Sequence, residues 1–361
     1  MAGRRNIYYW KSDRLFASGN TRKTDTAAPE ETSRQVKEYL STHFKQGLLS
    51  VEPAHGQGNH ITFIARYDDG DYFIRLENGP EGDNYMAVES HIMKLVREQG
   101  IPCPTIYLTD VSRKKVPFAI QVMERIDRAD LNQHAVTGNL DTTAIAREIG
   151  RYVARWQAIA TEGFGLFDVN TFITNGTLQG YHEQYSDYFM LNLNHHLDFL
   201  VKEHFLTKVQ GERIWAAVRD HESLLQLNRG CLVHKDLAFW NILGDARQIA
   251  AFIDWDDAIS GDPVDDLSLL ACFHPGHVVS AAIEGYREIS PLPNEFIPRF
   301  WLHLLRNMLF KAVIRVRGNY FDMPGDFFMN NGGSNRLRHF TLERIQSACD
   351  GLINEHSILS L

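Results

Sequence analysis

The sequence predicts an α+β protein whose early chain forms an antiparallel sheet and whose remainder is mainly helical. Short alternating apolar runs, typical of strands, dominate residues 48–123 and include a hairpin signal at Asp68-Asp69-Gly70. From residue 142 onward, apolar residues recur instead at helical spacing. With 361 residues, 44% of them hydrophobic, the chain is long enough for two lobes with sizeable cores.

Composition and charge argue against several classes of protein. The net charge of −8 argues against nonspecific binding to nucleic acids. The four cysteines are widely spaced and form no C-x-x-C pair, which argues against a disulfide framework or a zinc site and fits a reducing compartment. The start of the chain lacks an apolar signal core, and no apolar run is long enough to cross a bilayer. We therefore expect a cytoplasmic protein that binds neither nucleic acid nor membrane.

Residues 1–32 are polar and predict an N-terminal extension. Within it, only Tyr8, Tyr9 and Trp10 are candidates for docking on the rest of the protein. The first lobe is expected over residues 33–123. Its predicted elements are a helix, three strands, a helix and two strands, in this order: residues 33–44, 48–51, 61–67, 72–76, 85–99, 106–108 and 118–123.

The second lobe, residues 129–361, is predicted to be mainly helical. Amphipathic patterns place its helices at residues 142–160, 181–205 (one helix or two), 213–227, 296–316 and 338–353. The fourth of these combines an apolar stripe with the basic residues Arg306, Lys311 and Arg315. Because most such charges on a helix are solvated, we expect them to lie mainly on an exposed face. If some of them face the cleft instead, the acceptor would be anionic or neutral and not a polycation.

The most informative stretch is residues 231–243, CLVHKDLAFWNIL. His234 and Asp236 follow a short apolar run, and Asn241 comes five residues later, which is the H-x-D-x-x-x-x-N pattern of kinase-like phosphotransferases. Phosphoryl transfer needs a carboxylate to orient a hydroxyl and accept its proton, and a neutral oxygen ligand for Mg²⁺. We expect Asp236 to be the catalytic base and Asn241 to be a metal ligand.

A second carboxylate is expected close to Asn241. Residues 242–244 and 249–253 are apolar and flank a turn, so they predict a hairpin, and Asp254 follows its second strand. Because a hairpin folds back on itself, it would return Asp254 to the neighbourhood of Asn241. A carboxylate at this place can bridge Mg²⁺ to the phosphates of a nucleotide.

These residues resemble one family in particular. HKDLAFWNIL, followed by FIDWDDAISGDPVDDLSLL, is similar to the aminoglycoside phosphotransferase and choline kinase family. Protein kinases would show Asp-Phe-Gly and a later Ala-Pro-Glu, whereas this chain has Asp254-Trp255-Asp256 and no Ala-Pro-Glu. The resemblance covers the chain from about residue 33. It implies a bilobal protein-kinase-like fold, with an antiparallel-sheet N-lobe and a mainly helical C-lobe, and transfer of phosphate to a small molecule.

The resemblance also implies where the nucleotide, ATP or GTP, would bind. The loop with Gly56, Gly58 and Asn59 lies between two predicted strands, and its backbone amides would face the phosphates. The interlobe hinge is expected over residues 124–128. Three residues in and next to this hinge are expected to bind the adenine edge: Met123, Glu124 and Ile126.

Arg75 occupies the place where protein kinases carry a lysine on the third strand. We expect it to contact the phosphates, since a guanidinium can bind two phosphate oxygens and stays charged. Glu89, on the helix over residues 85–99, is its expected partner, and Glu81 is an alternative.

Several further residues are expected to support the site. By resemblance, His234 props the catalytic loop, and Asp262 and Asp266 brace it while favouring the start of a helix. Asp256 would assist a second metal ion or remain solvated. Lys235, where the family usually has glycine, would lie near the γ-phosphate or pair with a surface acid.

The sequence thus predicts an ATP- and Mg²⁺-dependent phosphotransferase that acts on a hydroxyl of a small molecule. Aminoglycosides or other antibiotics, choline, homoserine and sugars all remain possible acceptors. One alternative is a protein kinase, although the short link from Trp255 to Asp262 leaves little room for an activation segment. The other is a catalytically silent, nucleotide-binding pseudokinase, against which the intact Asp236, Asn241 and Asp254 argue.

Overall fold

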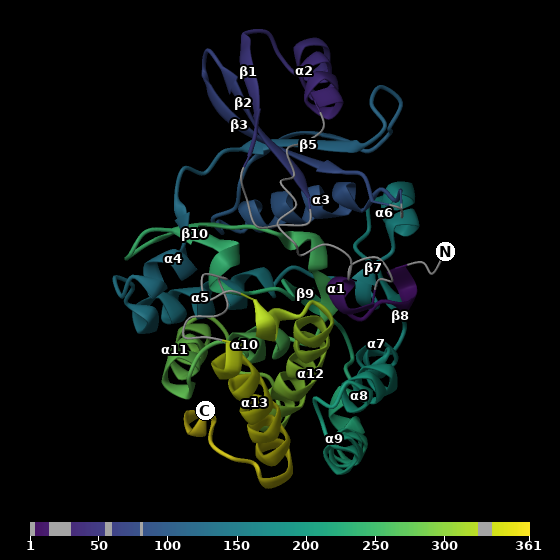
Figure 1. Cartoon of the computed structure of the whole chain (residues 1–361), viewed down its shortest axis with the longest axis vertical. Helices are drawn as coiled ribbons and strands as arrows, with labels where there is room; N and C mark the ends of the chain where they lie inside the picture. Colours follow the sequence, from purple (N-terminus) through teal and green to yellow (C-terminus); the bar gives the residue numbers. More distant parts are fainter. Residues whose placement is uncertain (1–3, 14–29, 55–59, 80–81, 324–333) are drawn as a thin grey trace.

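The computed structural model describes residues 4–13, 30–54, 60–79, 82–323 and 334–361. Figure 1 shows two lobes, a smaller one built on a sheet and a larger one built mainly of helices. The predicted α+β, bilobal kinase-like fold is confirmed. Among the helices of the described residues, none is both long and apolar enough to span a membrane.

The N-lobe is a five-stranded antiparallel sheet in the order β1-β2-β3-β5-β4. Alternation along its strands separates two faces. Ile74 and Ile120 point into an apolar core with Val36 of helix α2, whereas their neighbours Arg75 and Gln121 point to the opposite face. The bounds of its elements are α2 Glu30–His43, β1 Leu48–Pro53, β2 Ile61–Tyr67, β3 Gly70–Glu77, α3 Tyr85–Glu98, β4 Ile106–Asp110 and β5 Ala119–Glu124.

The C-lobe is organised around helix α12, Phe296–Arg317, in which every residue from 299 to 313 is buried. The helices around it are α4 Leu131–Val136, α5 Thr142–Trp156, α6 Val169–Asn175, α7 Tyr185–Phe189, α8 Leu193–Lys202, α9 Lys208–Asp220, α10 Asp265–Leu270, α11 Gly276–Arg287 and α13 Ser334–Asn354. Helices α5 and α11 cross at glycines. A Cβ atom at Gly150 would lie 1.8 Å from the carbonyl oxygen of Ala282, so only glycine fits there.

Two small sheets hold the catalytic loop in place. Strand β9, Cys231–Val233, enters the loop and pairs with β12, Ile259–Gly261. The loop leaves through the hairpin of β10, Ile242–Gly244, and β11, Ile249–Phe252. The other strands of these sheets are β6 Ala129–Asp130, β7 Phe164–Phe167 and β8 Gly180–His182. Both ends of the loop are therefore fixed by backbone hydrogen bonds.

Part of the predicted N-terminal extension is buried in the C-lobe. Residues 4–13, which include the short helix α1, Trp10–Asp13, pack against α7, α8 and α12. The Tyr8 ring stacks on Tyr188 with centroids 5.0 Å apart, and the Arg306 guanidinium lies 3.5 Å from its centroid. The Asp13 carboxylate accepts a hydrogen bond from the Tyr8 amide at 2.7 Å and lies 2.7 Å from Nε2 of His196. The segment is thus part of the core of this lobe.

Candidate active site

The catalytic loop presents Asp236 and Asn241 to the same point. Nδ2 of Asn241 donates to the main-chain carbonyl of Asp236 at 2.8 Å and to its carboxylate oxygen Oδ2 at 2.9 Å. Both side chains are buried. Because the amide nitrogen is used inside the loop, the amide oxygen of Asn241 is the atom left to ligate a metal ion.

His234 fixes the shape of the loop through backbone contacts, as the sequence predicts. Its Nε2 lies 3.0 Å from the carbonyl oxygen of Ile253, and its Nδ1 accepts from the amide of Asp236 at 3.3 Å. Burial lowers the pKa of this imidazole, so the ring is neutral with its proton on Nε2. The ring is positioned to hold the loop against the strand that carries Asp254.

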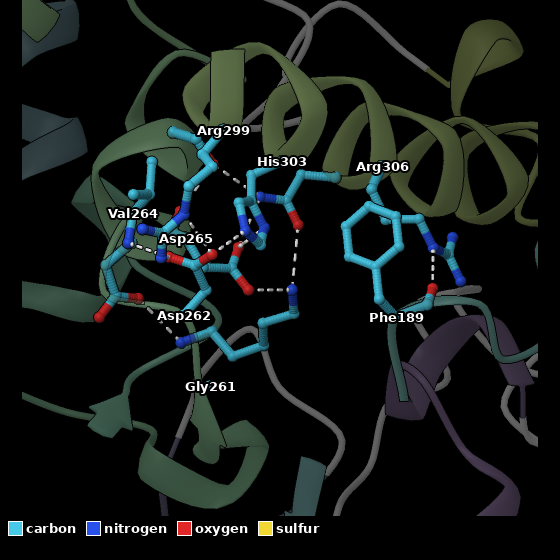
Figure 2. Close-up of polar contacts among 12 residues, drawn as sticks. Phe189, Gly261, Asp262, Val264, Asp265, Arg299, His303 and Arg306 are labelled. Atoms are coloured by element: carbon cyan, nitrogen blue, oxygen red, sulfur yellow. Dashed lines mark hydrogen bonds and ion pairs between the residues drawn. The ribbon is translucent and has the colours of Figure 1, made fainter. Parts of the chain in front are cut away.

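Asp266 and Asp262 have different partners, which corrects one expectation. Asp266 accepts from the backbone amides of His234 and Lys235 at 3.0 and 3.1 Å, so it braces the catalytic loop as predicted. Asp262 does not contact the loop. It accepts two hydrogen bonds from Arg299, at 3.0 and 2.5 Å, and one from the amide of Val264, as Figure 2 shows. Asp262 therefore anchors α12, and α10 begins only at Asp265.

Lys235 neither faces the phosphates nor pairs with a surface acid. Its ammonium is buried and donates to Asp265 at 2.6 Å, to the Tyr8 hydroxyl at 3.0 Å and to Asn307 at 3.1 Å. Its φ of 68° lies in the left-handed region that glycine adopts most easily, which explains why glycine is common at this place in the family. The three hydrogen bonds offset the strain of a lysine there.

The hairpin brings Asp254 back to Asn241. Ile242 pairs with Phe252, and the amide of Ile253 donates to the carbonyl oxygen of Asn241 at 3.0 Å. Burial and the neighbouring charge of Asp256 raise the pKa of Asp254 to about 6. A carboxylate that is crowded by another carboxylate favours a bound cation.

A candidate metal cluster lies at the end of this hairpin and includes a residue that the sequence did not single out. Ligand atoms of His60, Asp254 and Asp256 all lie within 4.8 Å of one another. His60 contacts both Asp256 and Glu77 at 3.2 Å, and these contacts outweigh its burial and raise its pKa to about 9. The carboxylates of Asp254 and Asp256, like the amide oxygen of Asn241, are donors of the kind that Mg²⁺ prefers. His60, when protonated, is an ion-pair partner of Asp256.

Arg75 lies between the two lobes as the sequence predicts. It forms an ion pair with the buried Glu89 of α3, and its second guanidinium nitrogen lies 3.7 Å from Oδ1 of Asp254. Glu81, the alternative partner, lies outside the described residues, as do Gly56, Gly58 and Asn59. The guanidinium is thus held beside the candidate metal cluster, where nucleotide phosphates would meet it.

The residues expected to bind adenine end strand β5 or follow it. The amide of Glu124 donates to the carbonyl oxygen of Thr105 at 2.8 Å, so the sheet already uses this donor. The Glu124 carboxylate accepts from Thr105 as well. Met123 is buried within the sheet, and Ile126 lies in the link between β5 and β6. Ile126 lies outside strand β5, so among the three residues it is the candidate for binding adenine whose backbone groups take no part in the sheet.

The N-terminal segment and α12 add residues around Asp236 that the sequence did not predict. The Tyr9 hydroxyl and the Lys11 ammonium both lie near the Asp236 carboxylate, and Nζ of Lys311 is 3.5 Å from its Oδ1. Burial alone would raise the pKa of Asp236, but Lys311 and Lys11 outweigh it and lower this pKa. Asp236 is therefore ionised at neutral pH, as a general base must be.

Comparison with known proteins agrees with the fold. The family model described as "Phosphotransferase enzyme family" (APH) matches residues 51–295, which is more than half of the chain. The protein therefore belongs to this family of phosphotransferases. No curated protein sequence matches it significantly.

Solved structures with the same fold share little sequence with it. Aminoglycoside phosphotransferase APH(4)-Ia, in a ternary complex with ADP and hygromycin B, is 15% identical with a TM-score of 0.60, covering 87% of this chain and 98% of that one. A putative aminoglycoside phosphotransferase from Ralstonia eutropha JMP134 is 15% identical (TM-score 0.60; 88% and 98% covered). A putative fructosamine-3-kinase from Thermobifida fusca is 17% identical (TM-score 0.55; 83% and 94% covered).

Proposed function

We propose that this phosphotransferase moves the γ-phosphate of ATP or GTP, with Mg²⁺, to a hydroxyl group of a small molecule. The observation that carries the proposal is the convergence of the catalytic loop, the β10–β11 hairpin and strand β3. Within the loop, Asn241 donates a hydrogen bond to Asp236 at 2.9 Å, and Arg75 of β3 lies 3.7 Å from Asp254 at the end of the hairpin. The relatives solved with ADP or AMP-PNP and hygromycin B support a nucleotide and a small-molecule acceptor.

Each residue has a defined task in this mechanism. The ionised Asp236 orients the acceptor hydroxyl and takes its proton. Asn241 and Asp254 would hold Mg²⁺, with Asp256 as a further oxygen ligand, and the ion would neutralise charge on the phosphates. Arg75 contacts the phosphates, while Glu89 fixes its orientation.

The test is a screen for Mg²⁺-dependent ATP consumption over amines, sugars, sugar acids and antibiotics, followed by Asp236→Asn. We expect the variant to lose about 10²- to 10⁴-fold in turnover, the usual contribution of a general base, and to bind Mg²⁺·AMP-PNP as tightly as the parent. Asp245→Asn, in the exposed turn of the β10–β11 hairpin, is the matched control. Turnover of Asp236→Asn at the parent rate would refute the assignment.

The same screen separates the two alternatives. A protein kinase would label polypeptides in a cell extract and no metabolite; the buried strand β12, which follows Asp254 by only a few residues, argues against a peptide-docking segment here. A pseudokinase would bind the nucleotide and consume none with any acceptor. The intact geometry around Asp236 supports an active enzyme.

A further inference from the structure

Three buried cations gather on the C-lobe side of Asp236. Lys311 and Arg315 lie one turn apart on α12, and Arg344 comes from α13. All three act electrostatically on the buried thiol of Cys272, just after α10, so they lie in the same region of the C-lobe. We call Lys311, Arg315 and Arg344 the cation cluster.

The cation cluster lacks the carboxylates that buried cations normally have. Within the described part of the chain, its single ion pair joins Lys311 Nζ to Asp236 Oδ1 at 3.5 Å. Arg315 donates only to the hydroxyl of Thr341, at 2.8 Å, and burial lowers its pKa to about 10. Buried guanidinium groups are usually paired, so positive charge of this kind indicates a negatively charged ligand.

Unused hydrogen-bond donors point to the same conclusion. Nε of Arg315 and Nη1 of Arg344 are buried and have no hydrogen-bond partner among the residues that the structure describes, and neither has Nε2 of His274, which lies in the same region. Arg306, equally buried on the same helix, donates instead to the carbonyl oxygens of Phe189 and Leu191, at 3.0 and 2.6 Å. The guanidinium of Arg306 therefore has hydrogen-bond acceptors, whereas Arg315 and Arg344 each keep a buried donor without one.

We propose that the acceptor carries a carboxylate or phosphate group, and that Lys311, Arg315 and Arg344 bind this group while Asp236 receives the proton of a nearby hydroxyl. This inference rests on the proposed function and names its substrate class: hydroxy acids, sugar acids or phosphorylated polyols. Guanidinium groups match both anions through paired hydrogen bonds. A polycationic acceptor would place its ammonium groups against three cations, which is unfavourable.

The cation cluster is separate from the place expected for the nucleotide phosphates. Among the described residues, neither Arg315 nor Arg344 forms an ion pair with Asp254 or Asp256. Arg75 is the cation beside that pair. Lys311 links the two regions, because it touches Asp236 and also packs 4.8 Å above the Phe273 ring. The acceptor hydroxyl would thus lie between the nucleotide and the cation cluster.

Inorganic phosphate is the first probe. The full-length protein is titrated with phosphate by calorimetry, alone and saturated with Mg²⁺·AMP-PNP, so that a phosphate site persisting with nucleotide bound is distinct from the nucleotide site. We expect Lys311→Met and Arg344→Gln each to weaken this binding about tenfold. Arg338→Gln, an exposed arginine on the same helix as Arg344, is the matched control and should bind like the parent.

Equal phosphate binding by all variants, or no phosphate site besides that of the nucleotide, would overturn the inference. If the variants instead weaken AMP-PNP, the cations serve the nucleotide and the inference is also wrong. Failure of the parent to bind AMP-PNP would refute the proposed function, while phosphate binding to the protein alone still tests the cation cluster. Turnover of glucosamine or kanamycin above that of glucuronate and glucose 6-phosphate would contradict an anionic acceptor.

Discussion

Two sets of buried charges flank the catalytic loop. In one set, Lys235 pairs with Asp265, and Arg299 pairs with Asp262 beside His303; we call these five residues the paired network, and Figure 2 labels Asp262, Asp265, Arg299 and His303. In the other set, the cation cluster, three positive charges have a single carboxylate, Asp236, within 4 Å among the described residues. Both sets are buried and both use α12. The two sets thus differ in pairing and not in burial, and the inference of an anion site rests on this difference.

The largest effect should follow from breaking the paired network. Lys235→Met removes the cation beside Asp265 and leaves a buried carboxylate without its main partner. The free energy of unfolding should fall by about 3–5 kcal/mol, as measured by urea denaturation. Lys208→Met, which breaks an exposed ion pair with Glu212, should change it by less than about 1 kcal/mol. Equal stability of the two variants would contradict the structural role of Lys235.

Two of the buried arginines of α12, Arg306 and Arg315, should respond differently to the same substitution. Arg306→Met leaves the carbonyl oxygens of Phe189 and Leu191 without donors, and each buried unpaired carbonyl costs about 1–3 kcal/mol. Arg315→Met removes an unpaired cation, and the Thr341 hydroxyl keeps its hydrogen bond to the Leu337 carbonyl oxygen. Thermal unfolding should therefore show a clear loss for Arg306→Met and none for Arg315→Met. A large loss for Arg315→Met would mean that Arg315 stabilises the fold.

Acid should weaken the paired network over a defined range of pH. Burial favours protonation of Asp262, but His303 and Arg299 outweigh it and hold its pKa at about 2. Because this pKa lies below the ordinary value, Asp262 contributes fully to the free energy of unfolding above about pH 4, and this contribution is lost as the pH falls toward 2. The loss should be about 2 kcal/mol. The Asp262→Asn variant should be less stable than the parent, and its free energy of unfolding should no longer fall between about pH 4 and 2. If it falls as steeply as in the parent, other carboxylates cause the effect.

The smallest effect is expected for Tyr9, which lies beside Asp236. Tyr9→Phe removes the hydroxyl near Asp236, one of several groups that lower the pKa of this carboxylate. The acidic limb of the kcat/KM profile should move to higher pH by less than about one unit, with turnover at neutral pH within about threefold of the parent. Tyr107→Phe, on the exposed surface of the N-lobe, is the control. A loss of more than about a hundredfold would place Tyr9 in the chemical step itself.

The catalytic loop and the hairpin were predictable because their geometry is local. His234, Asp236, Asn241 and Asp254 lie within one strand-loop-hairpin unit, so sequence spacing alone brings them together. The pair of Arg75 and Glu89 followed from an alternating strand and an amphipathic helix. Most element boundaries agree within a few residues; α2, for example, begins at Glu30 instead of residue 33.

The residues that the sequence missed depend on contacts between distant segments. Helical periodicity indicated that Lys311 and Arg315 face solvent, but α12 is covered on all sides, so its basic positions are buried as well. Polarity marked residues 1–32 as an extension, with Tyr8, Tyr9 and Trp10 as candidates for docking. These three residues are buried, but the contact of Tyr9 with Asp236 was not predicted. His60 joins Asp256 across the interlobe boundary, which no local pattern indicates.

Docking of residues 4–13 brings segments that are far apart in the sequence into contact. The carbonyl oxygen of Ser12 accepts a hydrogen bond from Arg317, 305 positions later, and the Tyr8 hydroxyl meets Lys235 after 227 positions. During synthesis on a ribosome, Tyr9 and Lys11 therefore cannot reach Asp236 until α12 has emerged from the exit tunnel. A nascent chain that already displays the whole catalytic loop would still lack the groups that residues 4–13 place around Asp236, so the enzyme should gain its full activity only once residue 317 has left the ribosome.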